Sequence, residues 1–278
     1  MNFGYLLIVK ENPDTDYLKL AYALALSIKN TQKDGYDKVA LVLDNKTGIE
    51  GLKSPWVFDE IIYTDLPSGW DGRSLMHDLT PWEYTVCLDS DMLFLRDYSH
   101  WIDYLIENRD LCIANKSYTY RNEIVSSDYY RKTFTANELP NLYSFYTFFK
   151  KNSSQSEDFF RLVKQITEMP NKFTNLFLTN RKPKILGTDE AFALAAKVLN
   201  MQDLSTPLEF PKIVHLKPMI QNFPWPCNLV SNHVGLYLDQ SGQLKIGNFL
   251  QDNIVHYVEK DFMTDEHISI LENIAWKK

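Results

Sequence analysis

Short apolar runs alternate with a helical pattern over residues 1–115, and this alternation restricts the chain to few folds. Leu20, Leu24 and Ile28 recur at helical spacing and predict an amphipathic helix over 17–30. The apolar runs that read as buried strands are 4–10, 38–43, 60–63, 84–88 and 111–114. Strands that alternate with helices predict a Rossmann-like sheet flanked by helices, so the expected fold class is α/β.

The second half of the chain is less regular. Residues 117–150 are rich in Tyr, Phe, Ser and Asn, and their weak periodicity predicts no definite element. A helix is predicted over 156–169, stopped by Pro170, and another over 188–199 with Thr188 as its N-cap. The elements expected after it are short strands at 213–216, 235–238, 244–246 and 253–258, and a terminal helix capped by Thr264 and Asp265. No repeat or linker divides the chain, which predicts one domain over 1–278.

Composition excludes several classes of protein. The net charge of −7 and the pI near 5.4 give no electrostatic case for binding nucleic acids or anionic membranes. Cys87, Cys112 and Cys227 are odd in number and form no CxxC pair, so reduced thiols and a cytoplasmic location are expected. The N-terminal apolar stretch is too short for a signal peptide, and no segment is long enough to span a membrane.

The strongest local signal is Asp89-Ser90-Asp91, which directly follows the buried run 84–88. In extended backbone the side chains of residues i and i+2 point the same way, so both carboxylates converge. Apolar residues flank the motif on both sides, and two unpaired carboxylates buried together are unfavourable unless a cation lies between them. Hard oxygen ligands suit Mg²⁺ or Mn²⁺, which keep coordination positions for substrate phosphates.

With this DxD motif the sequence resembles the GT-A glycosyltransferases, and most of all the glycogenin-like group of retaining enzymes, which includes galactosyltransferases of lipopolysaccharide synthesis. The resemblance implies a GT-A fold with a nucleotide-binding half at 1–115 and an acceptor-binding half at 116–278. It implies Mn²⁺ (or Mg²⁺) bound by Asp89 and Asp91, and a nucleotide-sugar donor, expected to be a UDP-sugar. The acceptor class stays open between a glycan, a lipid-linked precursor and a protein.

Other positions match the family pattern residue by residue. Arg73, upstream of the motif, corresponds to a basic residue that contacts the donor, and Ser90 is assigned to the same donor site. Tyr17 is the candidate for an aromatic residue beside the base. Asp189 and Glu190 open a helix where the family has an acid and an amide beneath the sugar, which makes them the catalytic candidates. For Asp189 a helix-terminal acid of small effect is an equally good interpretation.

The family also has a late His and Lys, the third metal ligand and a phosphate ligand, and here two segments compete. His256 with Lys260 is preferred for its distance from the helix at 188–199, while His215, followed by Lys217 and Pro218, is the alternative. The histidine not used is expected to be hydrogen bonded and to line the acceptor cleft. Trp225, held between two prolines, is a candidate acceptor platform.

The expected reaction is transfer of a sugar to an acceptor, by retention if the acceptor attacks from the side of the leaving group. If Glu190 instead acts as a general base on the opposite face, the enzyme inverts. A nucleotidyltransferase is disfavoured because no glycine-rich loop follows the first strand, and a glycoside hydrolase because acids at i and i+2 suit a metal better. A non-catalytic GT-A-like binding protein is the alternative favoured by the imperfect His/Lys motif.

Overall fold

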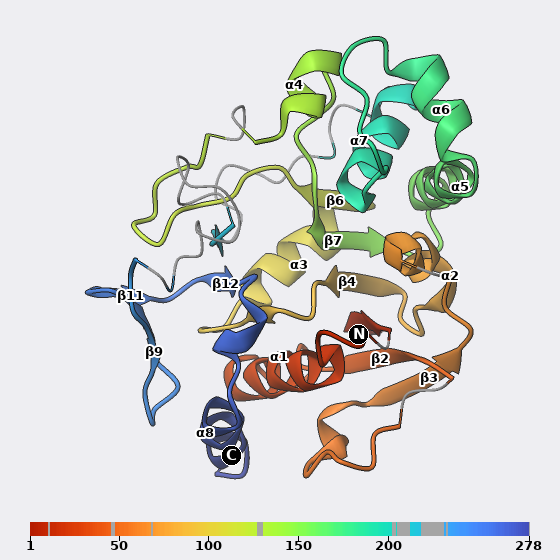
Figure 1. Ribbon diagram of the computed structural model, residues 1–278. Coiled ribbons are helices and arrows are strands. Elements are labelled where there is room, and N and C mark those ends of the chain that lie inside the picture. The colour runs from red at the N-terminus through yellow and green to blue at the C-terminus, as the bar shows by residue number, and fades with distance from the viewer. Residues whose placement is uncertain are drawn as a thin grey trace.

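A six-stranded sheet forms the centre of the protein, with strand order β3-β2-β1-β4-β7-β6 (Figure 1). The computed structural model describes residues 1–10, 12–45, 48–67, 69–126, 130–201, 204, 212–217, 231 and 233–277. The strands of this sheet are β1 (Phe3–Val9), β2 (Val39–Asp44), β3 (Glu60–Thr64), β4 (Tyr84–Leu88), β6 (Leu111–Ala114) and β7 (Tyr143–Lys150). All of them except β7 run parallel to one another, so the sheet is mixed, and the predicted α/β class is confirmed.

Strand β7 lies between β4 and β6 and pairs antiparallel with both, in a region for which the sequence predicted no definite element. Its sequence YSFYTFFK is aromatic on both faces, and nearly every residue is buried. A strand buried on both faces shows no alternation of polar and apolar residues, so periodicity alone does not reveal it.

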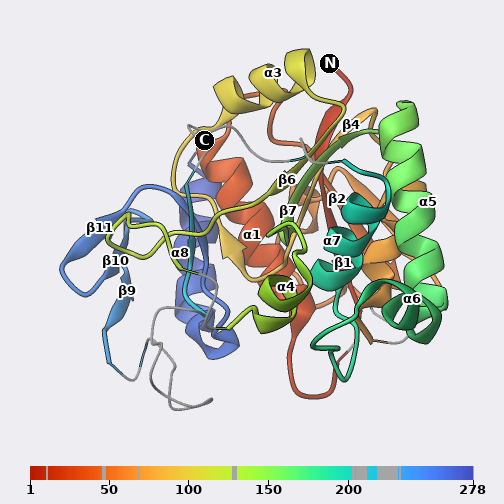
Figure 2. The same cartoon turned by 90° about the horizontal axis from the view of Figure 1, so that it is seen from above.

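Helices cover both faces of the sheet (Figure 2). Along β1, Tyr5 and Leu7 face one hydrophobic core and Leu6 faces the other, as the alternation of side chains in a strand requires. The first core contains residues of α1 (Tyr17–Thr31), α3 (Ser99–Asn108) and α8 (Asp265–Ala275). The second contains residues of α5 (Ser154–Glu168), α6 (Pro170–Phe177), α7 (Thr188–Val198) and the short α4 (Lys132–Asn137).

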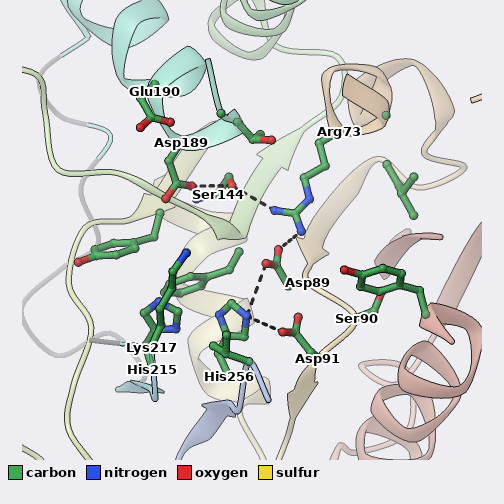
Figure 3. Close-up of a pocket in the computed structure, with 18 of the residues that line it drawn as sticks. Arg73, Asp89, Ser90, Asp91, Ser144, Asp189, Glu190, His215, Lys217 and His256 are labelled. Atoms are coloured by element: carbon green, nitrogen blue, oxygen red, sulfur yellow. Dashed lines mark hydrogen bonds and ion pairs between the residues drawn. The ribbon is translucent and has the colours of Figure 1, made fainter. Parts of the chain in front are cut away.

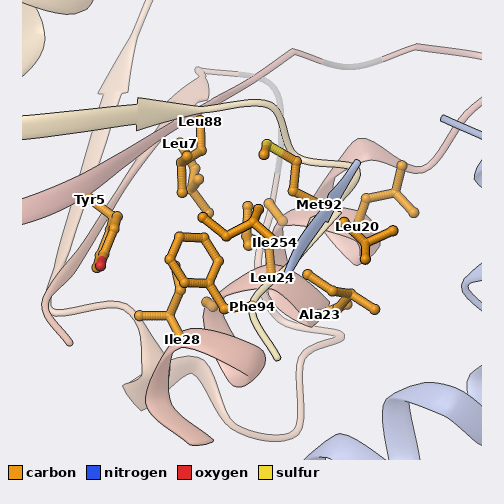
Figure 4. Close-up of a cluster of buried hydrophobic side chains, with 14 of the residues drawn as sticks. Tyr5, Leu7, Leu20, Ala23, Leu24, Ile28, Leu88, Met92, Phe94 and Ile254 are labelled. Carbon is orange, nitrogen blue, oxygen red and sulfur yellow. The ribbon is translucent and has the colours of Figure 1, made fainter. Parts of the chain in front are cut away.

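Two small three-stranded sheets complete the fold. One has the order β5-β12-β8, from β5 (Met92–Leu93), β12 (Ile254–His256) and β8 (Ile213–His215). It extends the first core, where Met92 and Ile254 pack near Leu24 of α1 (Figure 4). The other is formed by β9 (Leu236–Leu238), β10 (Leu244–Ile246) and β11 (Phe249–Gln251), and its β9–β10 pair confirms the predicted hairpin.

Most predicted elements are present, with some boundaries changed. Pro170 ends α5 as predicted but also begins α6, because proline is tolerated in the first turn of a helix. The N-cap of α7 is Gly187, not Thr188, which is the first helical residue. Thr264 does cap α8, accepting a hydrogen bond from the His267 N–H.

The stretch before β4 forms a 3₁₀ helix, η2 (Gly69–Leu75), followed by the short helix α2 (Met76–Leu79). The other 3₁₀ helices in the described part of the chain are η1 (Pro55–Val57) and η4 (Lys260–Phe262). Within the described ranges, no helix combines the length and the apolar character needed to cross a lipid bilayer.

Candidate functional site

A cleft of about 790 Å³ opens beyond the carboxyl ends of β1 and β4. Open α/β sheets bind their ligands at this edge. Residues far apart in the chain meet there: Asp89 and Asp91 follow β4, His256 ends β12, and Asp189 lies in the first turn of α7 (Figure 3). The positions predicted for donor binding also line the cleft, namely Tyr17, Arg73, Ser90 and Lys260.

The backbone around the DxD motif is held from two sides. The Asp89 N–H donates to the Phe145 carbonyl of β7 at 3.2 Å, and the Asp91 carbonyl accepts from the Tyr257 N–H at 3.1 Å. Asp91 is only 4% exposed. Pairing with the sheet therefore orients both carboxylates before any ligand binds.

His256 joins the two aspartates. Its Nε2 atom lies 3.1 Å from Oδ2 of Asp91 and 3.6 Å from Oδ2 of Asp89, and the three potential ligand atoms lie within 4.8 Å of one another. Two carboxylates and one imidazole form a donor set that fits Mn²⁺ and leaves coordination positions for other oxygen ligands. The arrangement agrees with the predicted metal ligands, and it is the only such group found among the described residues.

His215, the competing histidine, does not join this group. Its ring lies beside that of His256, with centroids 4.6 Å apart, because β8 pairs with β12 and aligns the two residues. It lines the cleft as predicted. The expected hydrogen bonding is wrong in part, since its buried Nδ1 atom has no partner among the described residues. Burial, with the neighbouring His256 adding to it, holds the pKa of His215 well below its ordinary value, so the ring is neutral.

Two cations approach the carboxylates. Arg73 forms an ion pair with Asp89 and donates a 3.1 Å hydrogen bond to the Ser144 hydroxyl, and Lys260 forms an ion pair with Asp91. Burial raises the pKa of Asp89 although Arg73 opposes it. For Asp91, burial acts in the same direction but is outweighed by His256 and Lys260, so the pKa is lowered. Lys260 Nζ also lies 5.5 Å from the ring centroid of Tyr17, which places this tyrosine beside the same group.

Asp189 belongs to a network that the sequence did not reveal. Its Oδ1 accepts hydrogen bonds from the Ser144 N–H at 2.8 Å and the Ser144 hydroxyl at 2.7 Å, and its Oδ2 pairs with Arg131 at 3.0 Å. Arg131 is buried between the rings of Phe134 and Tyr143. Neither Ser144 nor Arg131 lies in a recognisable motif, so no sequence signal identifies them.

Glu190 follows Asp189 in the first turn of α7 and turns back toward the N-cap. Its carboxylate accepts a hydrogen bond from the backbone of Gly187, as the third residue of a helix does in a capping box. Burial, with Asp189 adding to it, raises the pKa of Glu190. Glu190 therefore has both a structural role and the raised pKa of a carboxyl suited to proton transfer.

Two of the predicted features fall outside the site as described. Trp225, the candidate acceptor platform, and Cys227 lie outside the described residues. Cys87 and Cys112 are buried and take part in no disulfide among the described residues, as predicted.

Comparison with known proteins identifies the fold. No family model and no curated protein sequence matches the chain. Among solved structures, mouse xyloside xylosyltransferase 1 in its apo form matches with a TM-score of 0.55 and 10% identity, over 92% of this chain and 97% of that one.

Two bacterial glycosyltransferase structures also match. GlyE of Streptococcus pneumoniae TIGR4 has a TM-score of 0.50 and 13% identity over 97% of this chain, and the bifunctional glycosyltransferase WbbM has 0.53 and 14% over 98%. The chain spans 63% of the GlyE chain and 49% of the WbbM chain. These structures share the GT-A glycosyltransferase fold, which confirms the predicted fold of this chain.

Proposed function

We propose that the protein is a metal-dependent glycosyltransferase whose donor is a nucleoside diphosphate-sugar. The expected nucleoside diphosphate is UDP. The observation that carries the proposal is the convergence of Asp89, Asp91 and His256 at the carboxyl edge of a GT-A sheet. Arg73 and Lys260 stand beside these ligands, so the same place has positive charge available for a diphosphate.

Each group has a role that follows from its position. Asp89, Asp91 and His256 would hold Mn²⁺ or Mg²⁺, which when bound supplies Lewis-acid stabilisation of a leaving diphosphate. Lys260 and Arg73 add fixed positive charge toward the phosphates, and charge stabilisation of this kind is often the largest contribution to catalysis. Tyr17 lines the same cleft and would contact the base of the nucleotide.

The sugar is expected near Asp189 and Glu190. Asp189 accepts two hydrogen bonds from Ser144 and pairs with Arg131, so its carboxylate is already engaged and is poorly suited to taking up a proton. It is better suited to holding α7 against β7 and to orienting the sugar. Glu190, with its raised pKa, is the better candidate for proton transfer from an acceptor hydroxyl. A base on the face opposite the leaving group would give inversion, and the anomeric configuration of the product decides between this route and retention.

The non-catalytic alternative rested on the imperfect His/Lys motif. Both His256 and Lys260 reach Asp91 despite the changed spacing, which favours the enzyme. The expected cytoplasmic location stays a prediction, and fractionation of cells that produce the protein tests it.

Calorimetric titration with UDP and other nucleoside diphosphates tests the proposal, in Mn²⁺, in Mg²⁺ and in EDTA. We expect UDP binding that requires the metal and is lost in Asp91→Asn, while Asp252→Asn, a change of an exposed acid elsewhere, leaves it intact. A folded wild-type protein that binds no nucleotide in a metal-dependent way would overturn the assignment. Binding justifies a screen of UDP-sugars for donor hydrolysis and transfer.

A further inference from the structure

Residues 169–187, named here the basic-apolar segment, have a charge opposite to that of the rest of the chain. They contain Lys172, Arg181, Lys182 and Lys184 and no acidic residue. The whole chain has a formal net charge of −7, so the remainder has −11. The overall balance, which gave no electrostatic case for anionic membranes, therefore conceals a local basic surface. All four of these cationic residues are exposed.

The same segment exposes large apolar side chains. Leu176 is 62% and Ile185 80% exposed, and Met169 and Phe177 are also exposed. The other face of α6 is anchored, since Phe173 is buried in the second core and its ring stacks against that of Phe177. Exposed aliphatic side chains beside cations are typical of helices that lie in a lipid–water interface.

The segment is held in place by hydrogen bonds. Lys182 Nζ donates to the Asn175 side chain at 2.8 Å and joins the loop to α6. Asn137 of α4 accepts from the Asn180 N–H at 3.0 Å and donates to the Arg181 carbonyl at 2.9 Å. The exposed side chains of the segment thus stand as an outer surface on a backbone fixed against α4, and α6 lies at the outer edge of the molecule (Figure 2).

This surface adjoins the cleft. The segment ends at Gly187, which lines the cleft together with Thr188 and Asp189. Helix α4, to which the segment is bonded, contributes Lys132 and Phe134 to the same cleft. A surface bound through the basic-apolar segment would lie at the rim of the site near the residues assigned to the sugar.

We propose that the basic-apolar segment docks the protein on an anionic lipid surface, and that the acceptor is presented from that surface as a lipid-linked glycan. The second half of this proposal rests on the proposed function, whereas the first does not. Four cations match a surface of acidic headgroups. Leu176 and Ile185 would be buried among the acyl chains of a lipid layer, whereas a soluble anion offers them no apolar partner.

Vesicle co-sedimentation of the full chain tests the docking without nucleotide or metal. We expect binding to vesicles of phosphatidylcholine with phosphatidylglycerol, little binding to phosphatidylcholine alone, and weaker binding as salt increases. Lys182→Gln with Lys184→Gln should weaken binding by about tenfold or more. Leu176→Gln with Ile185→Gln should also weaken it. The matched controls Lys33→Gln with Lys245→Gln, and Leu250→Gln, change exposed residues elsewhere and should bind as wild type.

Three results would overturn the proposal. The first is that folded wild type ignores acidic vesicles, and the second is that the segment variants bind them as well as the controls do. The third is that the Leu176/Ile185 variant keeps its vesicle binding but loses a self-association seen by light scattering, which would make the segment a protein contact. UDP calorimetry on the same variants separates the two proposals, because loss of vesicle binding with intact UDP binding concerns docking alone.

Discussion

His256 brings its Nε2 atom to 3.1 Å from Oδ2 of Asp91, and Lys260 forms an ion pair with the same oxygen. One carboxylate oxygen is thus shared by an ammonium group and by the imidazole that we propose as a metal ligand. The relationship depends on β12 pairing with β5, which sets His256 opposite Met92, just after the motif. An imidazole can bind a metal and an ammonium group cannot, so His256 and Lys260 are expected to have different roles. Each can be tested separately.

Replacing His256 by Ala should weaken Mn²⁺ binding by at least roughly tenfold, because it removes one of three candidate ligands. Mutation of a residue that only orients a ligand already lowers metal affinity by about 10–100-fold. His215→Ala should have a smaller effect, since His215 packs against the His256 ring but is not one of the three candidate ligands. Titration of free Mn²⁺ by electron paramagnetic resonance measures both. A larger loss of Mn²⁺ affinity in His215→Ala than in His256→Ala would make His215, and not His256, the metal ligand.

Replacing Lys260 by Met should strengthen Mn²⁺ binding to the nucleotide-free protein and weaken UDP binding in the presence of the metal. The ammonium competes with a cation for the Asp91 oxygen, yet it supplies charge to a diphosphate. Lys217→Met, a change of another lysine in the cleft, serves as the control for overall charge. If Lys260→Met leaves both affinities at the wild-type value, Lys260 has no part in the site.

Tyr22 of α1 donates a 2.8 Å hydrogen bond to Glu272 of α8, and both side chains are buried. Tyr22→Phe should lower the free energy of unfolding by roughly 1–3 kcal/mol, because the carboxylate keeps its burial and loses a donor. Urea unfolding at neutral pH measures the loss. A variant as stable as wild type would mean that Lys53, which pairs with Glu272 at 3.3 Å, satisfies the carboxylate alone.

The same tyrosine predicts a pH dependence. Burial, with the Glu272 hydrogen bond adding to it, raises the pKa of Tyr22 to about 12, above the unfolded value of 10. The folded state therefore holds its proton more tightly, so this stabilisation is complete below pH 10 and is lost as pH rises through 12. Between these values, Tyr22→Phe should reduce the decline in stability by at most about 1.4 kcal/mol per pH unit. An unchanged slope would contradict the assignment.

Gly4→Ala should destabilise the protein by about 1–3 kcal/mol through overpacking. The added Cβ would overlap the indole of Trp82, which packs over the backbone of β1. Gly51→Ala is the matched control, because nothing lies within 4 Å of its added Cβ. Thermal or urea unfolding compares the two, and equal stabilities would show that Trp82 moves away without loss.

How much the sequence could predict depends on the range of the interactions concerned. The β1–α1–β2 pattern and the strand before Asp89 are local: their apolar periodicity, and acids at i and i+2, determine which way side chains point before any other element is present. Strand β7 was missed because its burial on both faces comes from neighbours on either side of the sheet. The exposed apolar face of α6 was not predicted either, since Pro170 was interpreted only as the end of a helix.

The sequence by itself determined the fold class, the position of the acidic motif at the end of a strand, and the small set of residues from which the site is drawn. It did not decide between His215 and His256, because each ends a short strand and their local patterns are alike. Only the tertiary structure decided this, by pairing β12 with β5 and setting β8 one strand further from the motif. The contacts of Ser144 and Arg131 with Asp189 were likewise revealed only by the tertiary structure. Which side chains meet across a sheet depends on strand order and register, and these are set by packing of the whole chain.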